Sequence, residues 1–181
     1  MQRDISVFLR KWKNSKVRQP LLIRGARQTG KTYSVRQFGK ANFENCVEIN
    51  FEEKPEFGQC FDNYDPKSII EKISILSNES INPGKTLLFL DEIQDYPSVI
   101  SSLRYFYEKM PGLHVIGAGS LIEFALKSEN FKMPVGRIQS IYMYPLSFGE
   151  FLDALNQSKL REYINTINLS DKFESIFEDK L

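Results

Sequence analysis

Cysteine is scarce in this sequence, with two among 181 residues. Cys46 and Cys60 lack the spacing of a metal-ligand pair, and nothing in the chain marks an extracellular protein. We therefore interpret both as free thiols of a protein in a reducing compartment.

Long apolar runs and an excess of charge of one sign are also absent. No run approaches the roughly 18–20 apolar residues of a transmembrane helix, and the N-terminus lacks the apolar core of a secretion signal. We expect a cytoplasmic protein without a membrane partner. Because 24 basic and 23 acidic residues leave a net charge of +1, bulk charge gives no argument for nucleic acid as a partner.

The chain is long enough for one α/β domain and hardly for two. Short apolar runs alternate with amphipathic helical patterns, which favours a parallel sheet with right-handed crossovers and helices on both faces. We predict five strands, at residues 21–25, 47–50, 86–90, 114–117 and 139–144. The expected α/β fold therefore has three layers, a parallel sheet between two layers of helices.

Three regions are expected along the chain. Residues 1–18 hold an amphipathic helix that packs on the core, residues 19–155 form the core, and residues 156–181 form a helical tail. The tail ends without a stop signal, so we interpret it as the truncated start of a C-terminal region. The first region also carries a basic cluster, which is either a solvated helix face or a contact for phosphate: Arg10, Lys11, Lys13, Lys16 and Arg18.

The most specific pattern is Gly-Ala-Arg-Gln-Thr-Gly-Lys-Thr at residues 25–32, which matches G-x-x-x-x-G-K-[ST] between an expected strand and an expected helix. Its two glycines allow a tight turn that directs consecutive N–H groups at a phosphate. Lys31 is expected to bridge the β- and γ-phosphates of a nucleotide, and Thr32 to offer its hydroxyl to Mg²⁺. We assign phosphate binding to Gly25, Ala26, Arg27, Gln28, Thr29, Gly30, Lys31, Thr32 and Tyr33.

A second pattern is the pair Asp91-Glu92 at the end of the apolar run Leu87-Leu-Phe-Leu90. Asp91 is expected to hold Mg²⁺ together with Thr32, since this hard cation takes few protein carboxylates. Glu92 is then a candidate base for an attacking water, with Lys31 as a catalytic cation. The alternative is a helix-capping acid pair.

Two further candidates for catalysis are Ser120 and Arg137. Ser120 follows an expected strand and is either a sensor of the γ-phosphate or the N-cap of the next helix. Arg137 is either a structural ion-pair partner or a cation that stabilises the transition state, in its own chain or across a self-association interface.

Five segments in this order resemble the large family of predicted prokaryotic AAA-type ATPases whose core precedes a C-terminal domain of unknown function: residues 25–32, 90–94, 118–120, 136–137 and 144–151. The resemblance covers residues 1–155. It implies a P-loop NTPase core, ATP with Mg²⁺ and an extra strand between the Walker A and Walker B strands. Family members commonly have Thr-Gly-Ser where this chain has Ala118-Gly119-Ser120, so the sensor role falls to Ser120.

Two functions follow as hypotheses. In the first, the chain hydrolyses ATP to drive a conformational change in itself or a partner. In the second, it is a nucleotide-gated binding module with little turnover, whose partner is a protein or, given the basic cluster, DNA.

Overall fold

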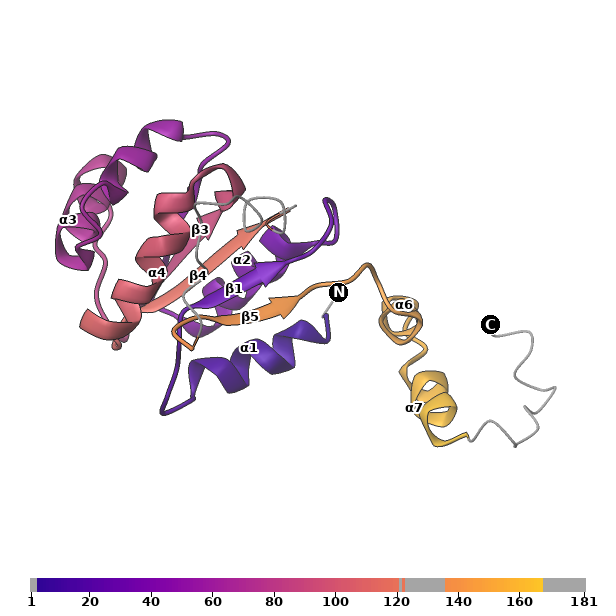
Figure 1. The fold of residues 1–181 in the computed structure, drawn as a ribbon. Helices are drawn as coiled ribbons and strands as arrows, with labels where there is room; N and C mark the ends of the chain where they lie inside the picture. The colour runs from indigo at the N-terminus through magenta and orange to yellow at the C-terminus, as the bar shows by residue number, and fades with distance from the viewer. Residues whose placement is uncertain (1–2, 121, 123–135, 168–181) are drawn as a thin grey trace. The chain divides into compact units, whose positions relative to one another are not determined.

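The computed structural model describes residues 3–120, 122 and 136–167 (Figure 1). Two compact units are distinguished. The larger is Ile5–Pro145, and the smaller joins the residues around Asp4 to those from Leu146 onward. The short helix expected from Leu121 lies outside the described residues, Ile122 apart.

The larger unit is built on a five-stranded sheet whose described pairings are all parallel. Its strands are β1 (Leu21–Arg24), β2 (Asn45–Asn50), β3 (Thr86–Asp91), β4 (His114–Gly119) and β5 (Gln139–Tyr142). Their order is β2-β3-β4-β1-β5. The expected extra strand is therefore confirmed, because β4 lies between β1, which leads into the phosphate loop, and β3, which ends at Asp91.

Helices cover both faces of this sheet, which confirms the three-layer fold (Figure 1). They are α1 (Ile5–Lys13), α2 (Lys31–Asn42), α3 (Pro66–Ser77) and α4 (Pro97–Lys109), with 3₁₀ helices η1 (Pro55–Phe61) and η2 (Ile93–Asp95). The side chains of a strand point alternately to its two faces. In β1, Leu21 and Ile23 accordingly pack with α1 and α2, whereas Leu22 packs on the opposite side with α3 and α4.

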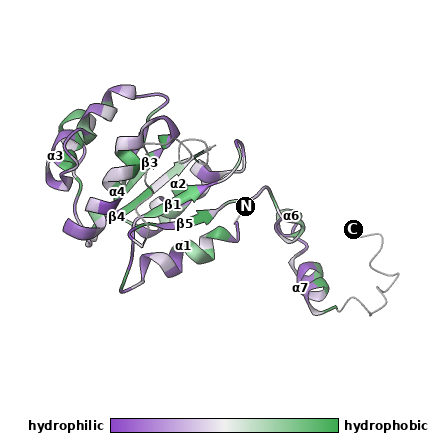
Figure 2. Cartoon of the chain, viewed as in Figure 1, coloured by the Kyte–Doolittle hydropathy of each residue, from purple (hydrophilic) through white to green (hydrophobic). Residues whose placement is uncertain are grey.

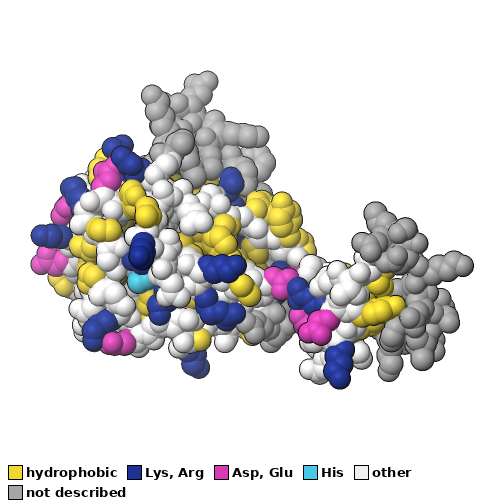
Figure 3. All heavy atoms as spheres, turned by 90° about the horizontal axis from the view of Figure 1, so that it is seen from below, with side chains coloured by type: hydrophobic (Ala, Val, Ile, Leu, Met, Phe, Trp, Pro, Cys, Tyr) yellow, Lys and Arg dark blue, Asp and Glu magenta, His cyan; other side chains and the backbone are white. Residues whose placement is uncertain are grey.

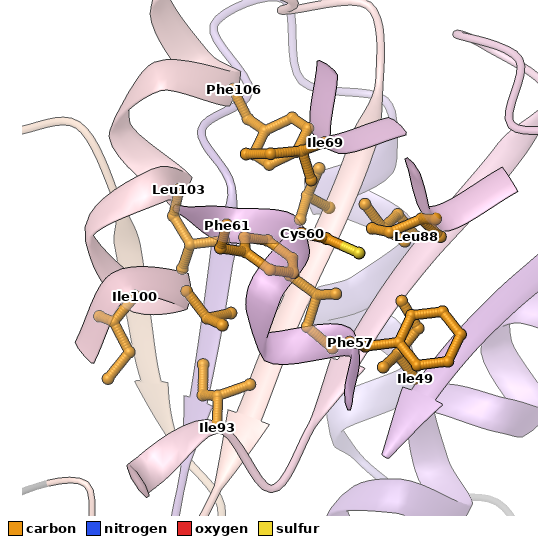
Figure 4. Close-up of a cluster of buried hydrophobic side chains, with 14 of the residues drawn as sticks. Ile49, Phe57, Cys60, Phe61, Ile69, Leu88, Ile93, Ile100, Leu103 and Phe106 are labelled. Carbon is orange, nitrogen blue, oxygen red and sulfur yellow. The ribbon is translucent and has the colours of Figure 1, made fainter. Parts of the chain in front are cut away.

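The core beneath α3 and α4 is aromatic and aliphatic, with Phe57 and Phe61 of η1 placed between the sheet and the helices (Figure 4). The central strands β1, β3 and β4 are buried along almost their whole length, as expected for a parallel sheet covered on both faces, and hydrophobic residues lie along the strands in Figure 2. Cys46 and Cys60 are free thiols, and burial raises the pKa of Cys46 to about 12.

The smaller unit contains α6 (Phe148–Ala154) and α7 (Ser158–Thr166). Ser147 and Glu150 form a capping box at the start of α6. Glu150 is buried and also accepts hydrogen bonds from Arg3 Nε and Asp4 N, both at 2.8 Å. Although burial disfavours its charge, these bonds and the Ser147 amide lower the pKa of Glu150 to about 2. The start of the described chain is thereby attached to this unit.

His114, at the start of β4, makes the stability of the larger unit depend on pH. The ring lies against Trp12 and Phe43, with Nε2 at 3.4 Å from the Lys13 carbonyl oxygen. Burial lowers the pKa of His114 to about 4, and the charges of Arg18 and Lys13 add to this effect. The side chain is therefore neutral at pH 7 in the folded protein.

We predict that stability falls on acidification through the range in which only the unfolded chain protonates this residue. That range lies between the unfolded pKa of about 6.5 and the folded pKa of about 4. At about 1.36 kcal/mol per pH unit, the loss from pH 6.5 to pH 5 is roughly 2 kcal/mol. Urea unfolding at pH 7 and pH 5 measures it, and His114→Gln should reduce the difference between the two pH values by that amount. An unchanged difference in the variant would refute the assignment.

Candidate active site

The phosphate loop connects β1 to α2 through backbone conformations that L-residues rarely adopt. The φ angles of Gly25, Gln28 and Gly30 are 149°, 63° and 87°. A Cβ at Gly25 would lie 2.2 Å from the carbonyl oxygen of Met143, so only glycine fits there. Gly30 caps α2 without a side-chain hydrogen bond, which leaves the first N–H groups of the helix available to an anion.

Lys31 is folded back over this loop. Its ammonium is largely buried and donates hydrogen bonds to the carbonyl oxygens of Gly25, at 3.0 Å, and Ala26, at 2.7 Å. Burial lowers the pKa of Lys31, while the negative charges of Glu92 and Asp91 oppose this shift. The loop therefore holds a buried cation against its own backbone carbonyl groups.

Thr32 and Asp91 meet at the junction of α2 and β3. The Thr32 hydroxyl donates to Asp91 Oδ2 at 2.7 Å, and the Glu92 amide donates to Oδ1 at 3.0 Å. Asp91 is 1% exposed, and burial raises the pKa of its carboxyl to about 6, with the Glu92 charge adding and the Thr32 bond opposing. A hydroxyl and a carboxylate so close together offer the hard oxygen ligands that Mg²⁺ takes.

Glu92 follows β3 directly and has a left-handed conformation, with φ 54°. Ser120, which follows β4 and is buried, directs its hydroxyl at Glu92 Oε2 over 3.5 Å. The two candidates are thus brought together because β3 and β4 are neighbours whose carboxyl ends meet at one edge. The alternative role of Ser120 as a helix N-cap involves residues outside those described.

Lys31, Thr32 and Glu92 line a cavity of about 480 Å³, large enough for a nucleotide. It is lined by Arg27, Gln28, Gly30, Lys31, Thr32, Tyr33, Arg36, Gln37 and Glu92. Tyr33 is half exposed in this lining, and Arg27 extends toward solvent, 3.5 Å from Glu52. The cavity, the loop that excludes a Cβ and the Thr32–Asp91 pair fit a nucleotide triphosphate with Mg²⁺.

Three residues near this site were not identified from the sequence. Arg36 and Gln37 line the cavity, and Arg36 makes a two-pronged ion pair with Glu48 of β2. Helical spacing could have indicated Arg36, since it lies four residues after Thr32 and hence on the same face of α2. The Oε1 atom of Gln94 lies so close to Gly119, at the end of β4, that a Cβ there would be 2.6 Å from it. No described group donates a hydrogen bond to this buried oxygen.

Arg137 does not reach this site within its own chain. It precedes β5, whose first residue Gln139 pairs with Leu21 at the start of β1, whereas the phosphate loop follows the end of β1. Arg137 Nε instead donates to Glu108 at 3.1 Å. Of the alternatives for Arg137, the ion pair is the one that the structure contains, and a role at the γ-phosphate of its own chain does not fit a residue at the opposite edge of the sheet. Action across a self-association interface stays a prediction.

Comparison with known proteins addresses the family. No curated protein matches the chain. A family model described as an AAA domain matches residues 17–152, which extend from just before β1 into α6. None of the helices in the described ranges is both long and apolar enough to cross a membrane. The match includes the sheet, the phosphate loop and Asp91-Glu92, so the chain belongs to the AAA domain family, with a core of the P-loop ATPase type.

Proposed function

We propose that this protein binds ATP with Mg²⁺ and hydrolyses it, and that the cycle drives a conformational change in the protein or a partner. The observation that supports this proposal is the convergence of Lys31, Thr32, Asp91 and Glu92 at the carboxyl edge of the sheet. Hydrolysis of a phosphoanhydride needs positioned charge and a positioned water more than covalent chemistry.

Each side chain has a separate task in this proposal. The loop N–H groups and Lys31 bind the β- and γ-phosphates, with Lys31 exchanging the Gly25 and Ala26 carbonyls for phosphate oxygens. Thr32 and Asp91 would hold Mg²⁺, which when bound neutralises charge on the phosphates. Glu92 accepts a proton from the attacking water, and Ser120 orients the carboxylate or the γ-phosphate.

Phosphate release from ATP tests the proposal. We expect release that depends on Mg²⁺, is stopped by a chelator and is lost in Lys31→Ala, with Lys40→Ala as the matched control. Lys40 is an exposed lysine in the last turn of the same helix. Absence of Mg²⁺-dependent release at every protein concentration, or equal rates in the two variants, would refute hydrolysis at this site.

One observation favours the second candidate, a nucleotide-gated binding module with little turnover. The two arginines that line the cavity are paired with carboxylates, Arg36 with Glu48 and Arg27 with Glu52, and Arg137 at the opposite edge is paired with Glu108. An arginine at the transition state is worth about 10³–10⁵ in rate. If Arg137 acts on a neighbouring copy, the rate per molecule will rise with protein concentration, whereas a binding module will bind ATP tightly and stay slow throughout.

A further inference from the structure

A second cavity lies at the edge of the sheet opposite the phosphate loop. Its volume is about 450 Å³, and its lining comes from segments that precede strands β1, β4 and β5: Ser15, Lys16, Val17, Arg18, Tyr107, Glu108, Pro111 and Arg137. Parallel strands all begin at the same edge, so the fold gathers these segments there. Apart from the predicted action of Arg137 on a neighbouring copy, the nucleotide proposal makes no use of this cavity.

The lining is positively charged. Lys16, Arg18 and Arg137 contribute three cations, and Glu108 contributes the one carboxylate. Glu108 already lies within 2.9 Å of Arg104 and 3.1 Å of Arg137, so its charge is compensated by two guanidinium groups. The cavity therefore presents uncompensated positive charge to solvent.

Arg18 is fixed in this lining by neutral partners. Its two terminal nitrogens donate to the carbonyl oxygens of Lys13, at 3.3 Å, and Pro111, at 2.7 Å, and the guanidinium lies 6.0 Å from the Trp12 ring. Carbonyl oxygens orient a guanidinium without cancelling its charge. Arg18 is thus a pre-positioned cation. Burial lowers the pKa of its guanidinium, but the ordinary value is so far above neutrality that the group stays charged.

Positive charge continues from the cavity along α1. Residues 5–19 contain five Lys and Arg and no Asp or Glu, although the whole chain has a net charge of +1. Arg10, Lys11 and Asn14 lie on the exposed face of this helical segment, which leads directly to Lys16. Seen from below, Lys and Arg side chains lie across the middle of this face, with acidic side chains toward the margins (Figure 3).

We propose that this basic edge, formed by α1, Lys16, Arg18 and the cavity, binds the phosphodiester backbone of nucleic acid. The nine residues of α1 extend about 13 Å, which spans several phosphates of a strand at one per 3.4 Å. A free phosphate or pyrophosphate would occupy the cavity alone and would not extend along the cations of α1.

A membrane surface fits this edge less well. An interfacial helix inserts large apolar side chains beside its cations. In α1 these side chains, Leu9 and Trp12, are buried in the core, and the exposed apolar groups of the segment are Val7 and Val17. The backbone of nucleic acid needs only the cations.

Fluorescence polarisation with labelled 20-mers of duplex and single-stranded DNA tests the proposal, without ATP, from 50 to 300 mM salt. The double variant Lys11→Gln/Lys16→Gln should weaken binding about tenfold or more and reduce the slope of log K against log salt by about 2, since each neutralised phosphate contact contributes about 0.9. The matched control is Lys54→Gln/Lys67→Gln, two exposed lysines outside the basic edge, and it should bind as the wild type does.

Three results would overturn the proposal. The first is no binding of either DNA at 50 mM salt, and the second is equal losses in the two double variants. The third is evidence for another ligand. Inorganic pyrophosphate could displace the labelled DNA completely when the two are compared at equal concentrations of phosphate groups. Alternatively, binding to anionic phospholipid vesicles could depend on Lys11 and Lys16 while DNA binding does not. Circular dichroism checks that all variants are folded. Because ATP is omitted, failure here leaves the ATPase proposal untouched.

Discussion

Glu92→Gln is expected to reduce phosphate release by about 10²–10⁴-fold, the usual contribution of a general base, while ATP binding stays within about threefold of wild type. The amide keeps the size of the carboxylate but cannot take a proton from water. The groups assigned to phosphate and Mg²⁺, namely Lys31, Thr32 and Asp91, do not depend on Glu92 for their hydrogen bonds except through its amide, which the variant keeps. The left-handed backbone at residue 92 should also tolerate glutamine, since Gln28 adopts φ 63° in the same protein.

Asp95→Asn is the matched control for this variant, because Asp95 is an exposed carboxylate in η2, three residues from Glu92. It removes the same charge nearby without removing the candidate base. Single-turnover phosphate release and calorimetric binding of ATP separate chemistry from binding. A Glu92→Gln rate above a tenth of the wild-type rate, or a loss as large in Asp95→Asn, would contradict the role of Glu92 as the base.

The parts of the site that could be predicted from the sequence are those encoded by consecutive residues. A phosphate loop needs its glycines, lysine and threonine at fixed spacing, and a metal carboxylate needs a strand end, so Lys31, Thr32 and Asp91 were identifiable before folding. The sheet order could be predicted only through the family resemblance, because strand alternation fixes parallel pairing but not which strand lies between which.

The remaining residues depend on tertiary contacts. Gln94 meets Gly119 because β3 and β4 are adjacent, and Arg36 meets Glu48 because α2 packs over β2. Arg137 shows the converse case. Its place before a parallel strand already assigns it to the edge opposite the loop, so topology alone could have removed it from the site of its own chain.

The two proposed phosphate-binding sites lie at opposite edges of the sheet. At the carboxyl edge, where Asp91, Gly119 and Arg24 end their strands, the proposed nucleotide site combines Lys31 and Arg27 with the backbone N–H groups of the phosphate loop. The amino edge collects arginine and lysine from three loops. If both proposals hold, phosphate binding at the carboxyl edge relies on oriented N–H groups and binding at the amino edge relies on side-chain charge, so added salt should weaken the second much more than the first.

Gly25→Ala should disrupt the fold of the phosphate loop. A methyl group at residue 25 would lie 2.2 Å from the Met143 carbonyl oxygen, at a φ of 149°. Met143 cannot easily withdraw, since its amide donates to the Arg24 carbonyl at 2.7 Å and continues the pairing of β5 with β1. Relief requires either a rebuilt loop or detachment of β5. We expect ATP affinity to fall more than 100-fold and the free energy of unfolding to fall by about 3 kcal/mol or more.

Gly84→Ala is the matched control, because it introduces a side chain at a positive φ without the steric clash expected in Gly25→Ala. Gly84 has φ 80°, and no atom lies within 4 Å of the position that a methyl group would take there, so this variant should lose about 1–2 kcal/mol of stability. Its ATP affinity should be unchanged, because Gly84 hydrogen-bonds to Gly112 at the edge away from the loop. Urea unfolding and calorimetric ATP titration of both variants provide the comparison. Equal stability losses, with ATP binding kept in Gly25→Ala, would mean that the loop accommodates a side chain, and the contact between Gly25 and Met143 would then not be what shapes the phosphate site.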